Sequence, residues 1–461
     1  MRKLFGIFIA IVFVVSTIEA QTSDAALRRA TEADAAAKAS NGGKLPTLAA
    51  AEHLSRAEAY MANRLFPQAR EHWAIVMDKH PDDAGIPKAL FGTARSYMWE
   101  REYLKAVDWF DKLIKDHLGT KDGREGLAFK GASYVRAGKN LEAAKTYEQY
   151  VSMFPEGEKI ESAHLNIIDA YREAGDFAKA DQWVRRTAAT FNGKPSEVNA
   201  LHAKLRMEIS RSNWNAAVST ADELDGKRFV GSMTSSDEVM YLRAFAYEKS
   251  SRLKEALAAY GLIKANNNSY YSGLAFDRRM HLITLGGSVA SSETFPKPSA
   301  SEYPILFSPQ VIKHAKKNKI DPRFVLAIMK QESSFKANAK SPAGARGLVQ
   351  LVYDTAIKYK DEAGYKNLTP DDLYNPETNV AIGSIYIRKI KDEFGGLYEA
   401  VAASYNAGED NAARWLNRTK PKEPGVFAAE VGFAETKNYV FKVMNNYRVY
   451  RELYDENLNR K

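Results

Sequence analysis

The N-terminal half of the chain contains a repeat of about 37 residues. Six alanines follow one another at separations of 37, 37, 37, 36 and 40 residues: Ala69, Ala106, Ala143, Ala180, Ala216 and Ala256. A tyrosine stands nine residues before five of them, and an aromatic residue stands four residues after four of them. Small residues at helix crossings, with aromatic side chains between, are typical of paired antiparallel helices. The period therefore predicts about six stacked helical pairs.

This pattern resembles the tetratricopeptide repeat, slightly lengthened, and implies an α-solenoid over residues 48–287. The fifth unit, around Trp214 and Ala216, is degenerate because Glu208 stands near the expected tyrosine. We interpret the repeated aromatics as core residues. The concave face of such a solenoid either binds a peptide, a glycan or a partner protein, or only frames the neighbouring domain, and the repeat is compatible with both.

The ends of the repeat region indicate how the chain is divided. At 461 residues the chain is too long for one ordinary core, so two or more domains are expected. Residues 21–47 are rich in Ala, Ser and Asp and predict a flexible or weakly helical lead-in. Residues 288–304 are rich in Ser and Pro without periodicity, which predicts a linker to a C-terminal domain at 305–461.

The first residues predict export. Arg2 and Lys3 precede an apolar run, and Ala20 ends a segment typical of a cleavage site, so residues 1–20 are predicted to be a cleaved signal peptide leading to the periplasm. Ile18 is unusual at its position, which leaves an uncleaved anchor as the alternative. The chain has no cysteine, so disulfides, thiolate metal sites and a lipid-bearing N-terminal Cys are excluded. We therefore expect no lipoprotein, and peripheral membrane contact at most.

Residues 321–350 carry the clearest chemical signal. Asp321 followed by Pro322 predicts a helix N-terminus. Apolar residues then recur at helical spacing: Phe324, Val325, Ile328 and Met329. Glu332 lies on the same apolar face, so burial should raise its pKa, which suits a general acid near neutral pH.

Three further segments follow in the C-terminal domain, which we expect to be entirely helical. Residues 341–348 include two glycines and a proline, so the backbone turns there and can approach a ligand, and a helix is expected over 347–359. Residues 404–408 read Ser-Tyr-Asn-Ala-Gly after an apolar helix. Residues 433–440 open the last long helix, with Glu435 at the positive end of its dipole. Taken alone, the last two are a helix C-cap and a helix start.

Together, the Glu-Ser pair, the G-L-x-Q run, the Y-N-A-G turn and the E-T-K-x-Y-V run resemble the soluble lytic murein transglycosylases, a branch of the lysozyme superfamily, over residues 307–450. The resemblance implies a lysozyme-like α-helical catalytic domain with Glu332 as the acid and later the base. It also implies that Tyr405 hydrogen-bonds Glu332. Substrate-binding or supporting roles are implied for further residues: Ser333, Ser341, Gln350, Tyr405, Asn406, Glu435 and Tyr439.

The function implied by this resemblance is that of a lyase acting on peptidoglycan. It cleaves the β-1,4 bond between N-acetylmuramic acid and N-acetylglucosamine and forms a 1,6-anhydro ring. Most glycosidases use two carboxylates, but only Glu332 has the marks of a catalytic acid here. Two alternatives stay open: a hydrolytic muramidase resembling goose-type lysozymes, with Glu435 or Asp354 as second carboxylate, and a non-catalytic binding protein acting through its solenoid.

The charge and the motifs of the chain indicate which classes of binding partner to expect. Residues 305–461 hold 25 Lys and Arg against 19 Asp and Glu, and a basic domain suits a polyanionic partner such as peptidoglycan strands, although a solvated surface explains the same imbalance. No clustered basic run indicates nucleic acid. No metalloprotease, phosphate-loop or serine-hydrolase motif is present, so we expect no cofactor and no metal. A protein partner of the repeats is the remaining expectation.

Overall fold

The computed structural model describes residues 25–285 and 295–461. The predicted signal peptide and residues 288–294 of the predicted linker lie outside these ranges. The chain divides into two compact units: Met1–Ala180 with Lys340–Ala345, and Asp181–Ala339 with Arg346–Lys461.

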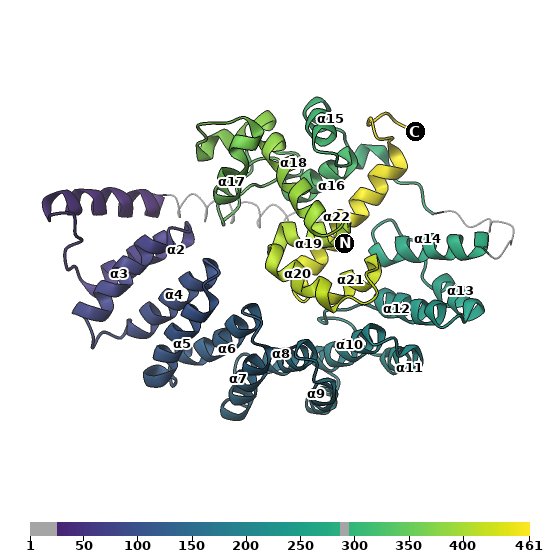
Figure 1. The fold of residues 1–461 in the computed structure, drawn as a ribbon, viewed down its shortest axis with the longest axis horizontal. Helices are drawn as coiled ribbons and strands as arrows, with labels where there is room; N and C mark the ends of the chain where they lie inside the picture. Colours follow the sequence, from purple (N-terminus) through teal and green to yellow (C-terminus); the bar gives the residue numbers. More distant parts are fainter. Residues whose placement is uncertain (1–24, 286–294) are drawn as a thin grey trace, which may run out of the picture. The chain divides into compact units, whose positions relative to one another are not determined.

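The first unit consists of successive antiparallel helices (Figure 1). Residues 25–40, within the predicted lead-in, are helical and bury Ala30 and Asp34. The repeat helices follow in order: α2 (Ala50–Ala62), α3 (Phe66–Lys79), α4 (Ile86–Trp99), α5 (Tyr103–His117), α6 (Lys121–Arg136), α7 (Asn140–Met153) and α8 (Ile160–Glu173). Helix α9 (Phe177–Thr190) begins in this unit and continues into the second.

The repeat residues explain why these helices pack in pairs. The aligned alanines of the first unit, Ala69, Ala106, Ala143 and Ala180, are fully buried. The aromatics four residues later are buried too, as expected for core residues: Trp73, Phe110 and Tyr147. A small side chain lets two helices approach closely, and the aromatic ring one turn later fills the space beside the crossing.

The second unit begins with the end of the repeat: α10 (Pro195–Ser210), α11 (Trp214–Leu224), α12 (Ser236–Lys249), α13 (Leu253–Gly261) and α14 (Tyr270–Leu285). The sequence alignment of the fifth repeat was wrong by one residue. Ala216 is exposed, whereas Ala217 is fully buried. A shift of one position turns a helical side chain by about 100°, so only Ala217 faces the crossing.

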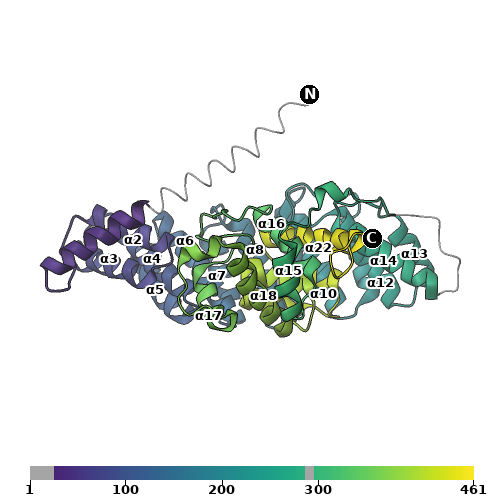
Figure 2. The same cartoon turned by 90° about the horizontal axis from the view of Figure 1, so that it is seen from above.

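The C-terminal helices complete the second unit: α15 (Ser308–Lys317), α16 (Pro322–Ser333), α17 (Tyr353–Ala363), α18 (Pro376–Glu393), α19 (Tyr398–Ala407), α20 (Glu409–Arg418), α21 (Pro424–Glu430) and α22 (Ala434–Leu453). The all-helical prediction is confirmed for the described residues, which contain only two isolated β-bridges besides helices and turns. Helix α21 was not predicted. Helices α16 and α22 pack against each other (Figure 2).

One hydrophobic core runs through the second unit and joins α10–α14 to the C-terminal helices. At their contact, the ring of Phe441 from α22 stacks on Tyr270 at 5.2 Å between centroids and meets Tyr271 edge-on at 5.4 Å. The last repeats and the C-terminal helices thus share buried side chains. The domain limits at 48–287 and 305–461 stay predictions.

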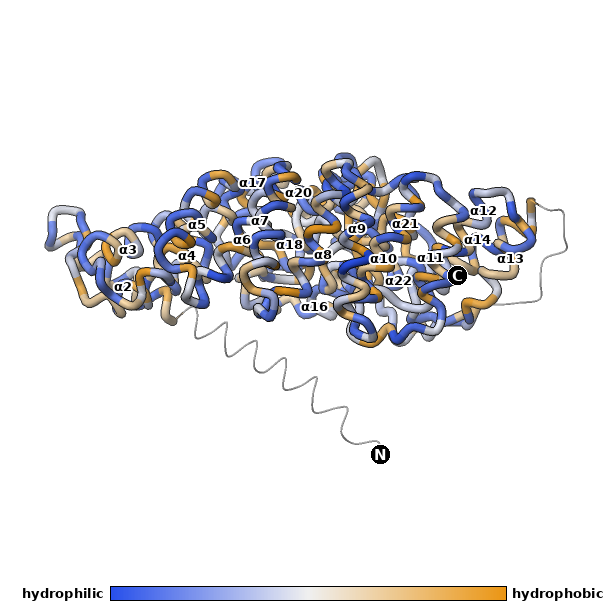
Figure 3. Tube along the Cα trace, turned by 90° about the horizontal axis from the view of Figure 1, so that it is seen from below, coloured by the Kyte–Doolittle hydropathy of each residue, from blue (hydrophilic) through white to orange (hydrophobic). Residues whose placement is uncertain are grey.

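Hydrophobic and hydrophilic residues alternate along the helices (Figure 3). This is the pattern of amphipathic helices that bury one face. Among the residues that the structure describes, no helix has the length and apolar character needed to cross a membrane.

Candidate active site

Helix α16 places Glu332 in its last turn. Asp321 caps the helix, since its Oδ1 accepts the Arg323 backbone N–H over 2.9 Å, and Pro322 occupies the first helical position. The predicted apolar face is fully buried: Phe324, Val325, Ile328 and Met329. After Ser333 the backbone turns, because Ser334 adopts a left-handed conformation with φ of 48°. Glu332 therefore lies where the helix ends.

Glu332 is half-buried, and its one hydrogen bond within the described residues comes from a tyrosine. The Tyr439 hydroxyl on α22 donates to Glu332 Oε1 over 2.5 Å. Burial raises the pKa of Glu332 to about 7, although the Tyr439 hydrogen bond lowers it in part. The carbonyl end of α16 further disfavours a negative charge here. At neutral pH a large fraction of Glu332 is therefore protonated.

The expected hydrogen bond from Tyr405 to Glu332 was wrong. Tyr405, on α19, has a single hydroxyl proton and donates it to the Val349 carbonyl oxygen over 2.7 Å. Tyr405 still lies close to the acid, because burial and then the Glu332 charge raise the pKa of Tyr405 well above its ordinary value. Tyr439 thus supports Glu332 directly, and Tyr405 supports the loop beside it.

The loop after α16 is held by side chains that turn inward. Ser333 Oγ donates to the Leu348 carbonyl over 2.7 Å. Gln350 Nε2 donates to the carbonyls of Ala339 and Gly347 over 3.0 and 2.8 Å. The Gln350 amide nitrogen is therefore committed to the loop, which fits a supporting role.

The helix expected over 347–359 begins only at Tyr353. Residues before it form an isolated bridge between Arg346 and Leu351, and Gln350 has a left-handed φ of 49°. Such a conformation cannot continue into an α-helix. The loop is closed instead by its own backbone pairing.

Asn379 on α18 holds the loop before α17 through three side-chain hydrogen bonds. Its Oδ1 accepts the Val349 N–H over 2.9 Å, and its Nδ2 donates to the Arg346 and Leu373 carbonyls over 2.9 and 2.8 Å. Gly347, with φ of 79°, lies so close that an added Cβ would meet Leu373 O at 2.2 Å. The close approach requires glycine here.

The other predicted residues differ in position. Asn406 Oδ1 accepts the Thr436 hydroxyl over 2.6 Å, which joins the end of α19 to the start of α22. Glu435 is exposed in the first turn of α22. Ser341 groups with the first unit, and within its own segment its Oγ accepts the Ala345 N–H over 3.1 Å.

Tyr386 is a site residue that the sequence analysis missed. It lies on α18, and its ring centroid is 5.3 Å from that of Tyr405 and 5.7 Å from that of Tyr359. After burial and Glu332, both Tyr405 and Tyr386 contribute to a raised pKa of Tyr439. Tyr386 thus lies beside Tyr405 and donates to Glu409 Oε1 over 3.4 Å, and the spacing of apolar residues in α18 did not single it out.

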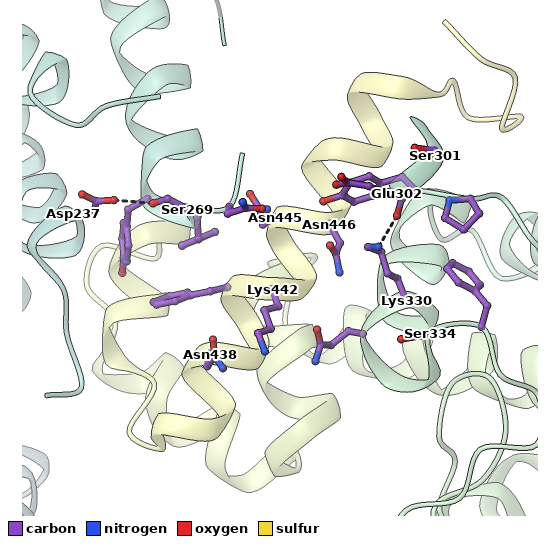
Figure 4. A pocket seen from close by; sticks show the side chains of 18 of the residues that line it. Asp237, Ser269, Ser301, Glu302, Lys330, Ser334, Asn438, Lys442, Asn445 and Asn446 are labelled. Carbon is purple, nitrogen blue, oxygen red and sulfur yellow. Dashed lines mark hydrogen bonds between the residues drawn. The ribbon is translucent and has the colours of Figure 1, made fainter. Parts of the chain in front are cut away.

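A polar pocket of about 960 Å³ opens beside the α16–α22 contact. Figure 4 shows Lys330 and Ser334 on the α16 side and Asn438, Lys442 and Asn446 on α22. Lys330 donates to the Glu302 carbonyl over 2.6 Å. Within the described ranges, Asn438 and Lys442 have no hydrogen-bond partner. Amide and ammonium donors of this kind suit a ligand rich in hydroxyl, carbonyl or carboxylate groups.

In residues 25–285 and 295–461, no group of three or more His, Asp or Glu side chains is arranged to hold a metal ion.

Known proteins share this C-terminal region. A family model described as Transglycosylase SLT domain matches residues 309–427. The "Soluble lytic murein transglycosylase" of Escherichia coli K12 is 31% identical over 153 residues, which are 32% of this chain and 23% of that protein. The "Membrane-bound lytic murein transglycosylase C" of Yersinia pestis is 29% identical over 170 residues, 31% of this chain and 47% of that protein. The chain thus spans well under two thirds of these relatives.

Two solved structures share the fold over a longer range. The lytic transglycosylase Slt of Pseudomonas aeruginosa, solved as an inactive mutant, matches 86% of this chain and 79% of its own with a TM-score of 0.52 at 16% identity. The 70-kDa soluble lytic transglycosylase of Escherichia coli matches 95% of this chain and 85% of its own with a TM-score of 0.51 at 16% identity. Residues 309–427 of this chain thus match the transglycosylase SLT domain model, and the paired helices of the repeat precede them.

Proposed function

We propose that this protein is a lytic transglycosylase that cleaves peptidoglycan glycan strands, with Glu332 as its single acid–base group. The observation that carries the proposal is the half-buried Glu332, whose pKa burial raises to about 7 and whose Oε1 accepts the Tyr439 hydroxyl. The SLT domain match and the named relatives support the substrate class.

The proposed reaction begins with proton transfer. Because Oε1 accepts the Tyr439 hydroxyl, the acidic proton of Glu332 resides on Oε2. It passes to the glycosidic oxygen between N-acetylmuramic acid and N-acetylglucosamine as the bond from that oxygen to C1 breaks. The neighbouring N-acetyl group stabilises the positive charge that develops at C1. Glu332 is left as a carboxylate.

The second step regenerates the acid. The carboxylate of Glu332 takes the proton of the 6-hydroxyl group of the same muramic acid residue, and O6 bonds to C1 to close the 1,6-anhydro ring. No water is consumed. A carboxyl group with a pKa near 7 can serve both steps, because its two protonation states are nearly equal in free energy at neutral pH.

The electrostatic surroundings of Glu332 within the described residues support this reaction over hydrolysis. Within the described residues, burial and Tyr439 account for the pKa of Glu332, and no other carboxylate contributes. Glu435 and Asp354, the candidates for a hydrolytic base, are both exposed. A hydrolytic muramidase would need one of them to hold a water molecule opposite Glu332.

The cellular setting is part of the same proposal. The predicted signal peptide directs the chain to the periplasm, where peptidoglycan lies, and the polar pocket beside α16 and α22 provides donors for substrate groups beyond the cleaved bond. A 70-kDa soluble lytic transglycosylase forms a complex with bulgecin A. We therefore propose that bulgecin A binds this protein and suppresses its activity.

Mass spectrometry of peptidoglycan digested by the mature protein tests the proposal. Anhydro-muropeptides are expected from the wild type and not from Glu332→Gln, with bulgecin A suppressing them. Reducing-end products would replace the proposal with a hydrolytic muramidase. No products from the wild type would leave a binding role for the solenoid.

A further inference from the structure

The first turn of α22 contacts two parts of the second unit. Tyr439 reaches Glu332, whereas Lys437, two residues earlier, is buried and donates to Glu238 Oε1 over 2.7 Å. Lys437 also donates to the Ala429 carbonyl over 3.3 Å. Glu238 is fully buried and belongs to α12, a helix of the repeat region. A repeat residue is thus bound to the helix that supports the catalytic acid.

Lys437 is the cationic partner of the Glu238 carboxylate. Burial raises the pKa of Glu238, but the charge of Lys437, together with the contacts that His202 and Lys437 make with it, holds this pKa below its ordinary value. His202 Nε2 lies 2.8 Å from Glu238 Oε1, and burial lowers the pKa of His202 to about 4, so the ring is neutral at pH 7. Arg206, the next charged group on α10, pairs with Glu430 over 2.9 Å. Glu238 and Lys437 therefore neutralise each other.

A buried pair of this kind is better suited to fixing a position than to adding stability. Removing two charges from water costs about as much as their attraction returns, and an apolar contact would hold two helices at least as well. The pair is favourable only when its two ends meet in one geometry. Lys437 must therefore sit opposite Glu238, which fixes the rotation and height of α22 at its first turn.

We propose that Glu238 is a positioning residue of the active site: through Lys437 it holds the first turn of α22, so that the Tyr439 hydroxyl stays within hydrogen-bond distance of Glu332. The catalytic acid is therefore supported by the repeat region as well as by the SLT domain. The inference rests on the proposed function for its effect on activity, but its geometric part is independent of the reaction.

A second contact from the repeat region supports the neighbouring helix. Tyr270, on α14, donates to Glu399 Oε1 over 3.0 Å, and both side chains are buried. Glu399 lies in the first turn of α19, the helix that carries Tyr405 and Asn406. The adjacent Tyr271 donates to the Gly425 carbonyl over 3.0 Å. The repeats thus contact α19 through Tyr270 and α22 through Glu238.

The protonation of Glu332 reports on this geometry. Of the side chains around it, Tyr439 from α22 donates the hydrogen bond that lowers its pKa, while Tyr405 from α19 donates elsewhere and Tyr386 from α18 lies beside Tyr405. If α22 moves, that hydrogen bond lengthens and the pKa of Glu332 rises. A loss of global stability alone would not change the pKa in the folded protein.

The test uses the full chain with Glu238→Gln, which keeps the size of the side chain and removes its charge. We expect kcat on peptidoglycan to fall roughly five- to tenfold with KM within about twofold, and the basic limb of the kcat–pH profile to move up by about half a unit. Should this variant fail to fold, Glu238→Asp keeps the charge, shortens the reach to Lys437 and is expected to act in the same direction.

Glu197→Gln is the matched control. Glu197 is also a buried carboxylate of the repeat region, and it pairs with Lys227 over 2.6 Å and accepts the Gly193 N–H over 2.8 Å. Its partners lie outside residues 305–461. We expect Glu197→Gln to lower the melting temperature without moving the pH limb or kcat.

Two results would overturn the inference. The first is a Glu238→Gln protein whose activity falls only as far as its melting temperature predicts, with an unmoved pH limb. The second result does not depend on activity. A wild type without activity on peptidoglycan would contradict the proposed function but would leave this inference open to a direct test. The pKa of Glu332 is then read directly by carbon-13 NMR, and an unchanged value in Glu238→Gln contradicts the positioning role.

Discussion

Asp34 in the first unit and Glu332 in the second are both carboxyl groups that accept a tyrosine hydroxyl, and they differ in the other groups around them. Tyr60 donates to Asp34 Oδ2 over 2.6 Å, and Tyr439 donates to Glu332 Oε1 over 2.5 Å. The local hydrogen bond is nearly the same in both places. Their pKa values nevertheless move in opposite directions.

Asp34 is surrounded by further donors. Arg56 donates to its Oδ1 over 2.6 Å, and His72 Nε2 lies 2.9 Å from its Oδ2. Burial raises the pKa of Asp34, but the hydrogen bonds from Tyr60, His72 and Arg56 together hold it below its ordinary value. These bonds connect the helix at residues 25–40 to α2 and α3, so the carboxylate acts as a structural anchor.

Among the described residues, Glu332 has Tyr439 as a hydrogen-bond partner but no cation. Without a cation, desolvation dominates and favours the protonated form. A buried carboxyl group that is left unbalanced carries a cost in stability, and such a cost is common at functional sites. Within the part of the chain that the structure describes, the lack of a cationic partner, and not the tyrosine, distinguishes Glu332 from Asp34.

The largest expected effect is on the free energy of unfolding at pH 8. Replacing each of the two carboxyl groups by its uncharged amide should change this free energy in opposite directions. Asp34→Asn should destabilise residues 25–80 by about 3 kcal/mol, because Tyr60 and His72 lose a charged acceptor and the half-buried Arg56 keeps only the exposed Glu52 as its charge partner. Glu332→Gln should raise the free energy of unfolding by up to about 3 kcal/mol, because a group with pKa raised to about 7 is most costly when ionised.

Denaturant unfolding and hydrogen–deuterium exchange of the two variants measure this difference. The sign for Glu332 follows from its raised pKa: the wild type keeps its full stability below the unfolded value near 4.5 and loses some of it as the pH rises through about 7. The gain of Glu332→Gln should therefore vanish at pH 4. A gain that persists at pH 4 would contradict the account.

A tenfold effect is expected from the two tyrosines. Tyr439→Phe removes the hydrogen bond to Glu332, so kcat should fall about tenfold and the pKa of Glu332 should rise further. Tyr60→Phe removes the corresponding bond to Asp34 and should leave kcat unchanged while lowering the melting temperature. Equal losses of activity in the two variants would contradict the claim that Glu332 serves catalysis whereas Asp34 serves stability.

The smallest expected effect concerns Glu435, an exposed carboxylate that has no ion-pair partner within residues 25–285 and 295–461. Glu435→Gln removes a favourable charge in the first turn of α22, which is worth about 0.5 kcal/mol of stability. Steady-state kinetics should show a change in KM of a few-fold at most and an unchanged kcat. A loss of kcat of a hundredfold or more would point to Glu435 as a second catalytic carboxylate.

Much of the fold followed from local patterns. Periodic spacing of small and aromatic residues predicted the helical pairs, because burial of one helix face requires that spacing. The same argument placed Glu332 on the apolar face of α16 and predicted its raised pKa. These features depend on residues close together in the sequence.

The partners of Glu332 could not be predicted in this way. Tyr439 donates to Glu332, whereas Tyr405 donates to the Val349 carbonyl of the loop, and the sequence does not distinguish these two partners. The late start of α17 depends on Asn379, about 30 residues further along the chain. Tyr386 and Glu238 lie on α18 and α12, and tertiary packing decides which side of each helix faces the site.

The pKa of Glu332 in the full chain tests the central claim most directly. Carbon-13 NMR of protein labelled in its glutamate side chains, with Glu332→Gln to assign the resonance, gives this value. We expect a titration near pH 7, and a basic limb of kcat at the same pH in the wild type. A titration near 4.5 would mean that Glu332 is ionised at neutral pH, and would contradict its role as the acid.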